Sequence, residues 1–112
     1  MIYHIVSKTD WAAIGDSPHY RGDTLDTEGF IHCSTLEQVL DTANYLFRGR
    51  EDLVLLQINP DKLNSPLKYE DGGDGRLFPH IYGPMEVEAV EAVADFPPNP
   101  DGTFFDLPVS FQ

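Results

Sequence analysis

The sequence predicts a single small α+β domain, and three observations lead to this expectation. The chain has 112 residues, of which 41% are hydrophobic, a size and composition typical of one domain with one globular core. Several apolar runs have the length of β-strands, and one run has the spacing of an amphipathic helix. No internal repeat is visible. We expect residues 1–96 to form the domain and residues 97–112 to form a tail that packs on it or trails from it.

The first third of the chain is predicted to contain short strands around a polar segment. The expected strands comprise residues 1–7, 19–21 and 30–33. A short helix over residues 10–14 would begin after Thr9, a residue type that caps helices. The rest of the segment 16–28 is polar and rich in turn-forming residues, so we expect turns there.

The clearest helix begins near residue 35. Ser34 and Thr35 each start a capping box, in which Glu37 or Gln38 stands three residues further on. The apolar residues that follow recur at helical spacing and form one face: Leu36, Val39, Leu40, Ala43, Leu46 and Phe47.

The second half of the chain is predicted to be mainly extended. The expected strands comprise residues 53–58, 67–70, 81–82 and 89–96. Residues 85–94 also fit a helical pattern, but we favour the strand interpretation. Residues 60–63 can form one helical turn, and residues 71–75 form a glycine-rich acidic loop. In the tail, Phe104, Phe105 and Leu107 could attach the chain to the domain.

Composition excludes several classes of function. The formal net charge of −12 repels phosphate backbones, so nucleic acid is not an expected partner. No apolar run approaches the roughly 20 residues of a membrane helix, and no signal peptide is recognisable, so we expect a cytoplasmic protein without a membrane contact. Cys33 is the only cysteine, which excludes an internal disulfide and fits a reducing compartment. We expect its thiol to be buried and inert. Oligomeric state cannot be inferred.

Three of the four histidines lie inside short apolar runs, and this is the main functional signal. His4 follows Tyr3 in the first strand, His32 lies within the strand 30–33, and His80 precedes the strand 81–82. A neutral imidazole can donate or accept a proton near pH 7. One such histidine alone is most often a hydrogen-bonded core residue. Three together predict a polar pocket that a small-molecule ligand could occupy.

Two further features extend this pocket hypothesis. Glu70 ends a strand beside the glycine-rich loop, where a carboxylate can act as a general base or hold a ribose hydroxyl. We therefore expect His4, His32 and His80 to face one cleft with Glu70 at its rim. The same four side chains could alternatively bind a metal, although none of them has the short spacing of a metal motif.

The segments Gly29-Phe30-Ile31-His32-Cys33-Ser34 and Phe78-Pro79-His80-Ile81-Tyr82-Gly83-Pro84 carry a family resemblance. Together with the opening Ile2-Tyr3-His4-Ile5 and with Lys68-Tyr69-Glu70, they resemble the bacterial family called domain of unknown function 952. The resemblance covers residues 1–96. At the level of fold, that family is similar to ADP-ribosyltransferases and RNA 2′-phosphotransferases. It therefore implies a split, mostly antiparallel sheet with packed helices, and NAD or an ADP-ribosylated intermediate in the cleft.

The resemblance also implies roles for individual residues. The first-strand histidine, His4 after Tyr3, would contact a ribose, and Glu70 would engage the ribose next to nicotinamide. The turn from Gly29 and Phe30 to Ser34 would hold the cofactor, together with Tyr82. His32 or His80 would transfer a proton.

These implications give a leading hypothesis and two alternatives. The leading hypothesis is attack at the anomeric carbon of an ADP-ribosyl group, with His4, His32, Glu70 and His80 as catalytic residues. The first alternative is a ligand-binding module without turnover. The second is a metal-dependent enzyme that uses the histidines and Glu70.

Overall fold

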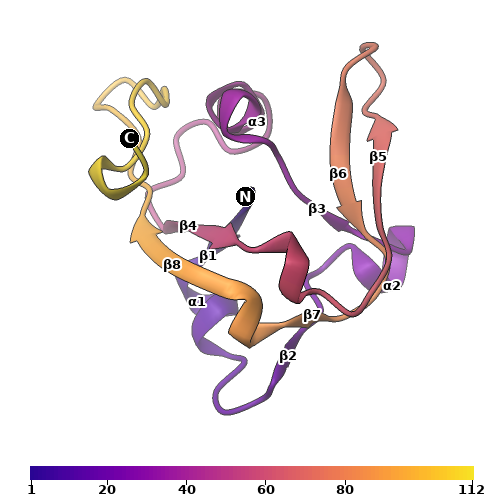
Figure 1. The fold of residues 1–112 in the computed structure, drawn as a ribbon. Coiled ribbons are helices and arrows are strands. Elements are labelled where there is room, and N and C mark those ends of the chain that lie inside the picture. The colour runs from indigo at the N-terminus through magenta and orange to yellow at the C-terminus, as the bar shows by residue number, and fades with distance from the viewer.

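The computed structural model describes residues 1–112 and shows a small mixed α and β domain built on antiparallel sheets (Figure 1). A three-stranded sheet has the order β1-β4-β8, with β1 at Ile2–Ser7, β4 at Leu53–Ile58 and β8 at Val90–Asp95. A second has the order β3-β6-β5, with β3 at Ile31–His32, β6 at Leu77–Ile81 and β5 at Leu67–Asp71. The short strands β2 (His19–Tyr20) and β7 (Met85–Glu86) form a separate pair.

The two larger sheets meet at a single backbone pairing between Tyr3 and Ser34. The Tyr3 amide donates to the Ser34 carbonyl at 2.8 Å, and the Ser34 amide donates to the Tyr3 carbonyl at 2.7 Å. Because only this pair connects β1 to the segment that follows β3, the sheets diverge on either side of it. The divergence opens space between β1, α3 and the β5–β6 hairpin.

Three short α-helices connect the strands: α1 (Lys8–Ala12), α2 (Leu25–Glu28) and α3 (Val39–Leu46). Single 3-10 turns lie at Leu36–Gln38, Pro60–Lys62, Val87–Ala89 and Val109–Phe111. None of the helices combines the length and the apolar character that crossing a membrane requires.

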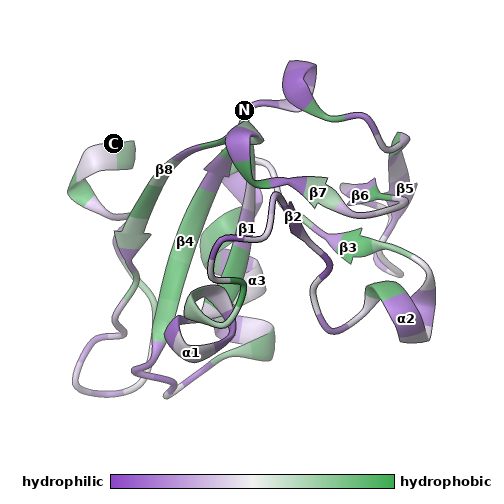
Figure 2. Ribbon diagram, turned by 90° about the horizontal axis from the view of Figure 1, so that it is seen from below, coloured by the Kyte–Doolittle hydropathy of each residue, from purple (hydrophilic) through white to green (hydrophobic).

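The core lies on both faces of the β1-β4-β8 sheet. Ile2 and Val6 of β1 belong to one cluster of buried side chains, whereas Tyr3 and Ile5 belong to the other. Since β4 is central and covered on both faces, it is apolar at almost every position, as Figure 2 shows. Burying one large aliphatic side chain contributes about 1.5–3 kcal/mol to stability, so this strand anchors the domain.

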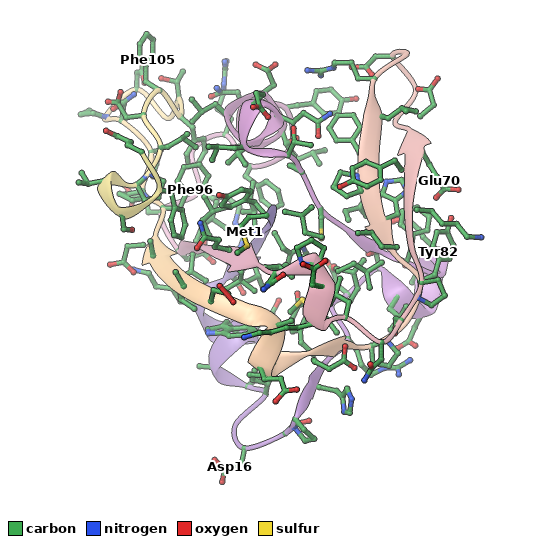
Figure 3. All side chains as sticks on the ribbon, viewed as in Figure 1. Met1, Asp16, Glu70, Tyr82, Phe96 and Phe105 are labelled. Atoms are coloured by element: carbon green, nitrogen blue, oxygen red, sulfur yellow. The ribbon has the colours of Figure 1, made fainter.

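The tail packs against α3. Phe104 and Phe111 are buried in the same cluster as Val39 and Ala43 of α3. The Asn44 side chain fixes the backbone of Phe104, since its Nδ2 donates to the Phe104 carbonyl at 2.8 Å and its Oδ1 accepts from the Phe104 amide at 2.7 Å. Phe105 points outward and is exposed (Figure 3).

Most predicted elements are present, with shifted boundaries. The strand 53–58 is confirmed without change, and the capping box of Thr35 with Gln38 is formed. The strand interpretation of the ambiguous segment is confirmed over residues 90–95.

Two predictions near the N-terminus were wrong. The first helix starts at Lys8 rather than residue 10, because Ser7 and not Thr9 is the cap: the Ser7 Oγ accepts from the Asp10 amide at 3.0 Å. The short strand expected at residues 19–21 is present as β2, but the rest of the segment 16–28, which we expected to form turns, ends in the one-turn helix α2.

The strand β6 begins earlier than predicted, because Pro79 made residues 77–80 look unlike a strand. A proline lacks an amide proton and normally avoids a central strand. Here the Pro79 carbonyl accepts from the Cys33 amide at 3.0 Å, so the Pro79 nitrogen also faces the β3 side. The Pro79 nitrogen thus takes no part in the ladder with β5, and it lies opposite Cys33, just past the end of the two-residue β3.

We predict that native Cys33 reacts slowly with thiol reagents. Cys33 is 4% exposed, and burial raises the pKa of its thiol, so the reactive thiolate is scarce. Labelling of the folded chain should be at least about 100-fold slower than labelling of the chain unfolded in denaturant at the same pH. Equal rates in the two states would contradict the buried position of this side chain.

Candidate functional site

A cavity of about 1530 Å³ lies where the two sheets diverge. Its wall is formed by β1, α1, the segment from β2 to α2, β3, α3 and the tip of the β5–β6 hairpin. All four histidines contribute to this wall, whereas Glu70 does not. The cavity is large, so a shared position in its wall does not show that two histidines contact the same ligand. The contacts of each histidine must be compared to find which of them form a site.

His32 and His80 stand side by side on the second sheet. β3 and β6 are antiparallel, and their register pairs His32 with His80 and Ile31 with Ile81. Ile31 and Ile81 are fully buried in the core. Because neighbouring side chains of a strand point to opposite faces, both imidazoles lie on the face turned away from that core.

Phe30 packs on both imidazoles. Its ring is stacked on His80 with 4.1 Å between ring centroids and 20° between ring planes. The His32 ring meets Phe30 edge-on at 4.7 Å and His80 edge-on at 5.2 Å. The three rings form a compact group, which we call the ring cluster, and all three residues line the cavity.

Glu70 orients His80 from the neighbouring strand. The His80 Nδ1 atom lies 2.9 Å from Glu70 Oε1, and because a carboxylate can only accept, Nδ1 carries the proton. The Tyr82 hydroxyl donates to the same oxygen at 2.5 Å. Both donors lower the pKa of Glu70, the Tyr82 hydroxyl more than His80. Glu70 and Tyr82 lie close together beside β5 in Figure 3.

The other ring nitrogen of His80 is available to a ligand. Nε2 has no hydrogen-bond partner within the protein, although the His80 side chain is only 7% exposed. No buried side-chain nitrogen of the chain lacks a partner, so solvent reaches this atom. With the proton fixed on Nδ1, Nε2 presents a lone pair that can accept a proton or a hydrogen bond.

His32 also pairs with a carboxylate, but loosely. Its Nε2 lies 3.1 Å from Glu28 Oε2, and both side chains are nearly half exposed. Solvent screens an ion pair of this kind, which contributes little to stability. His32 is therefore the more exposed and more weakly held member of the cluster, whereas His80 is buried and bound to Glu70.

His4 serves a different purpose. Its Nδ1 donates to the His32 carbonyl at 2.5 Å, and its Nε2 accepts from the Tyr20 hydroxyl at 2.7 Å. His4 as a whole residue is 8% exposed. Its ring packs against Tyr20 and not against the ring cluster. His4 lines the same cavity as His32 and His80, but it clamps β1, β2 and β3 together and has no nitrogen free for a ligand.

The other residues implicated by the sequence fall into two groups. Tyr3 and Ser34 line the cavity, but both are buried, with the Tyr3 ring against Phe111 and the Ser34 hydroxyl 3.2 Å from that of Thr42. Gly29 and Tyr82 lie outside the wall. Gly29 ends α2 with a φ of +88°, a left-handed conformation that favours glycine.

The four metal-ligand candidates are not arranged around a common point. No group of three or more histidine, cysteine, aspartate or glutamate side chains in the structure could hold a metal ion. The Glu70 carboxylate already binds Nδ1 of His80, while His4 is occupied by Tyr20 and the backbone. The geometry thus favours hydrogen bonding over metal ligation.

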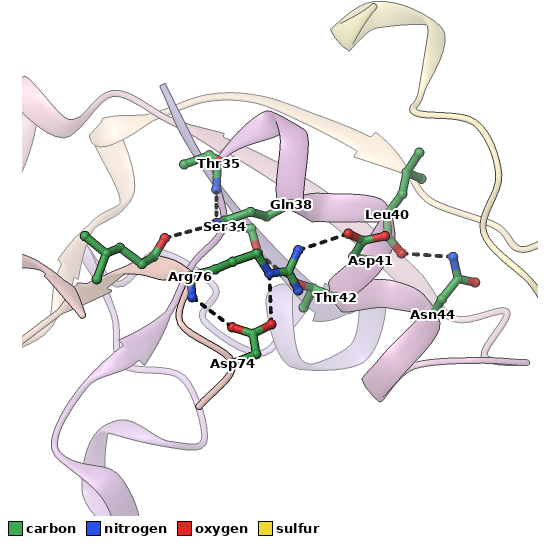
Figure 4. Close-up of polar contacts among 10 residues, drawn as sticks. Ser34, Thr35, Gln38, Leu40, Asp41, Thr42, Asn44, Asp74 and Arg76 are labelled. Carbon is green, nitrogen blue, oxygen red and sulfur yellow. Dashed lines mark hydrogen bonds and ion pairs between the residues drawn. The ribbon is translucent and has the colours of Figure 1, made fainter. Parts of the chain in front are cut away.

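The tip of the β5–β6 hairpin is tied to α3 across the cavity (Figure 4). Arg76 Nη1 lies 3.0 Å from Asp41 Oδ2, and Arg76 Nε lies 2.9 Å from Asp74 Oδ2. The Gln38 side chain donates to the Leu77 carbonyl at 2.7 Å. These exposed contacts close one side of the cavity with side chains rather than with backbone pairing.

Sequence reasoning missed several residues of the site. Glu28 stands four residues before His32, but α2 ends at Glu28 and His32 lies in β3, so the four-residue spacing of a helix does not predict the pair. The ion pair of Asp41 with Arg76 joins positions 35 residues apart, so no local signal reveals it. His19 lies in the wall but contacts Glu86 at 3.4 Å and not the ring cluster.

Comparisons with known proteins agree with the observed fold. The model of the family described as "Protein of unknown function (DUF952)" matches residues 5–93. None of the curated proteins compared with the chain matches it. A crystal structure of protein CC0527 from Caulobacter crescentus is 37% identical, with 91% of this chain and 90% of that chain covered and a TM-score of 0.83.

Two more solved structures of CC0527 are similar to the chain. The crystal structure of a double mutant is 36% identical and has a TM-score of 0.82, with coverage of 91% and 90%. The solution NMR structure is 38% identical and has a TM-score of 0.79, with coverage of 92% and 90%. The architecture is thus shared over nine-tenths of both chains.

The burial of His4 predicts a pH-dependent stability. Burial lowers the pKa of His4 below its ordinary value of 6.5, although the bond to the His32 carbonyl opposes this shift. Below about pH 6.5 the unfolded chain binds a proton that the folded chain does not, so stability falls as pH falls. Each pH unit costs at most about 1.4 kcal/mol from one such group.

The measurement is denaturant unfolding at pH 7.5 and pH 5.5. His4→Gln should be less stable at pH 7.5 but lose less stability between the two pH values than the unsubstituted protein. His19→Gln, which removes a half-exposed imidazole, provides the reference for losing one titratable side chain. A loss in His4→Gln as large as in the unsubstituted protein would contradict the neutral, buried state of His4.

Proposed function

The chain belongs to the DUF952 family, and we propose that it binds a small molecule with a planar ring in the cavity, where His80 exchanges a proton with it. The observation that carries this proposal is the state of His80. Its Nδ1 is held by Glu70, its Nε2 has no protein partner, and its ring is stacked on Phe30. Such an arrangement orients a proton acceptor without occupying it.

These contacts suggest a separate role for each residue around His80. Glu70 is a positioning residue, because it fixes the orientation and tautomer of His80 and is itself held by Tyr82. Phe30 offers an aromatic edge to a planar ligand beside the two imidazoles. His32 is close enough to His80 to receive or supply a second proton.

The narrower form of the proposal is ADP-ribosyl transfer. In that reaction the bond from the anomeric carbon to nicotinamide breaks and its electron pair goes to the ring nitrogen. The incoming nucleophile bonds to the same carbon and gives its proton to His80 Nε2. Glu70 lies outside the cavity wall, so its Oε2, which has no protein partner, could hold a ribose hydroxyl and stabilise positive charge only if the ribose extended beyond the wall.

The support for this narrower form comes from the split sheet and from the position of the first-strand histidine at its junction. His4 would have to release Tyr20 or the His32 carbonyl before it could contact a ribose. We therefore assign the proton transfer to His80 and a positioning role to His4.

A binding module without turnover is the second candidate. The ring cluster contains a single firmly held acid–base pair, His80 with Glu70, whereas the His32 pair is half exposed. One acid–base pair without a second firmly held proton donor can bind and polarise a ligand without completing a reaction. Release of nicotinamide from NAD separates the two candidates, since only the enzyme produces it.

We predict that NAD, ADP-ribose, adenosine or nicotinamide stabilises the folded chain. A ligand present at 100 times its dissociation constant adds about 2.7 kcal/mol to the free energy of unfolding, which thermal unfolding detects readily. His80→Gln should weaken binding by roughly two- to tenfold, the cost of one hydrogen bond. Calorimetry measures the dissociation constants.

Matched controls keep this test specific. His19→Gln removes an imidazole of the cavity wall that does not contact the ring cluster, and Glu88→Gln removes an exposed carboxylate outside the wall. The control variants should bind as the unsubstituted protein does. Equal losses in His80→Gln and His19→Gln would remove the ring cluster from the site. No stabilisation by any of the four compounds at millimolar concentration would contradict the proposed ligand class.

A further inference from the structure

The cavity wall carries more negative than positive charge. It contains six carboxylates and three guanidinium groups, and no lysine. The carboxylates belong to Asp10, Asp23, Glu28, Asp41, Asp71 and Asp74. A concave wall with one predominant sign of charge raises the local concentration of ligands of the opposite sign.

The three guanidinium groups are already neutralised. Arg21 Nη2 lies 2.7 Å from Asp26 Oδ1, and Arg50 Nη2 lies 2.7 Å from Asp52 Oδ2. Arg76 is shared between Asp41 and Asp74. No arginine of the wall is therefore free to hold a phosphate or a carboxylate of a ligand, which weighs against the ADP-ribosyl form of the proposed function.

Asp10 and Asp23 have no cationic partner. Neither takes part in an ion pair, and both belong to the wall. Tyr20 lies in the same part of the wall: Asp23 follows it by three residues, and Asp10 precedes Trp11, whose ring meets the Tyr20 ring edge-on with 5.8 Å between centroids. Asp71 at the end of β5 also has no ion pair, so the unbalanced charge lies both there and in the part of the wall that α1 and the segment from β2 to α2 provide.

The ring cluster supplies an independent observation that points to the same ligand class. The His80 side chain is 7% exposed and its Nε2 has no protein partner. Since Nδ1 carries the proton, Nε2 accepts, and it requires a ligand with an N–H or O–H donor. An ionised carboxylate has no such donor, whereas an amidinium-type cation has several. Aromatic faces also attract cations.

We infer that the cavity selects a planar organic cation that carries N–H donors, of the amidinium or aminoheteroaromatic type. This inference rests on the proposed function, because it names the chemical class of the ligand at the same site. The N–H group donates to His80 Nε2, the planar part lies against the ring cluster, and the positive charge is balanced by the wall carboxylates.

The test uses three probes of nearly equal shape: benzamidine, benzamide and benzoate, which are cationic, neutral and anionic at pH 7.5. Dissociation constants come from NMR titration of the full chain, followed at the imidazole signals of His80 and the ring signals of Phe30. Benzamidine should bind about two- to fivefold more tightly than benzamide, the effect of a solvent-screened charge pair. Benzoate should bind most weakly, and 0.5 M salt should reduce the difference.

Charge-removing variants assign the preference to the wall. Asp23→Asn and Asp10→Asn should each reduce the benzamidine preference, whereas Asp106→Asn, an exposed residue of the tail, should not. Tighter binding of benzoate, or equal binding of all three probes with the His80 signals still shifting, would overturn the cation preference and leave the proposed site intact. Absence of any shift at His80 and Phe30 with all three probes would overturn the site as well.

Discussion

The antiparallel pairing of His32 with His80 is the constraint on which the candidate site depends. The same two strands pair Ile31 with Ile81, and these isoleucines are fully buried. A shift of register by one residue would place the imidazoles in the core and the isoleucines in solvent, at a large cost in free energy. The hydrophobic core therefore fixes the imidazoles on the outer face. The position of the two histidines is a consequence of folding and not of any bond that they make themselves.

Different contacts give His80 and His4 different properties. His80 is enclosed by Phe30 and held by Glu70, which in turn is held by Tyr82, so its ring has one orientation and one free nitrogen. His4 is enclosed as well, but both of its nitrogens bind other groups. The contrast shows that burial alone does not define a functional histidine. A ligand needs an imidazole that is fixed on one side and unoccupied on the other.

The sequence was informative where local chemistry decides the structure. The continuous apolar run of β4 and the capping box of Thr35 with Gln38 depend on neighbouring residues, and both were predicted. The sequence was less informative where contacts between residues far apart in the chain determine the structure. The first residues of β6 were not predicted, because Pro79 argues against a strand. The proline is tolerated because its nitrogen faces the position just past the end of the short strand β3. His4, His32 and His80 line one cavity wall and Glu70 does not, and the different contacts of His80 and His4 depend on Glu70 and Tyr20, which lie on other strands.

The tautomer of His80 decides whether an acceptor faces the cavity, and nitrogen NMR of the ¹⁵N-labelled chain near pH 8 measures it without a ligand. Free neutral histidine favours the form with the proton on Nε2. Because Nδ1 donates to Glu70, His80 should carry its proton on Nδ1 and have an unprotonated Nε2. Glu70→Gln should weaken this preference, and Glu88→Gln should leave it unchanged. A His80 ring protonated on Nε2 in the unsubstituted protein would contradict the proposed role of His80, because no acceptor would then face the cavity.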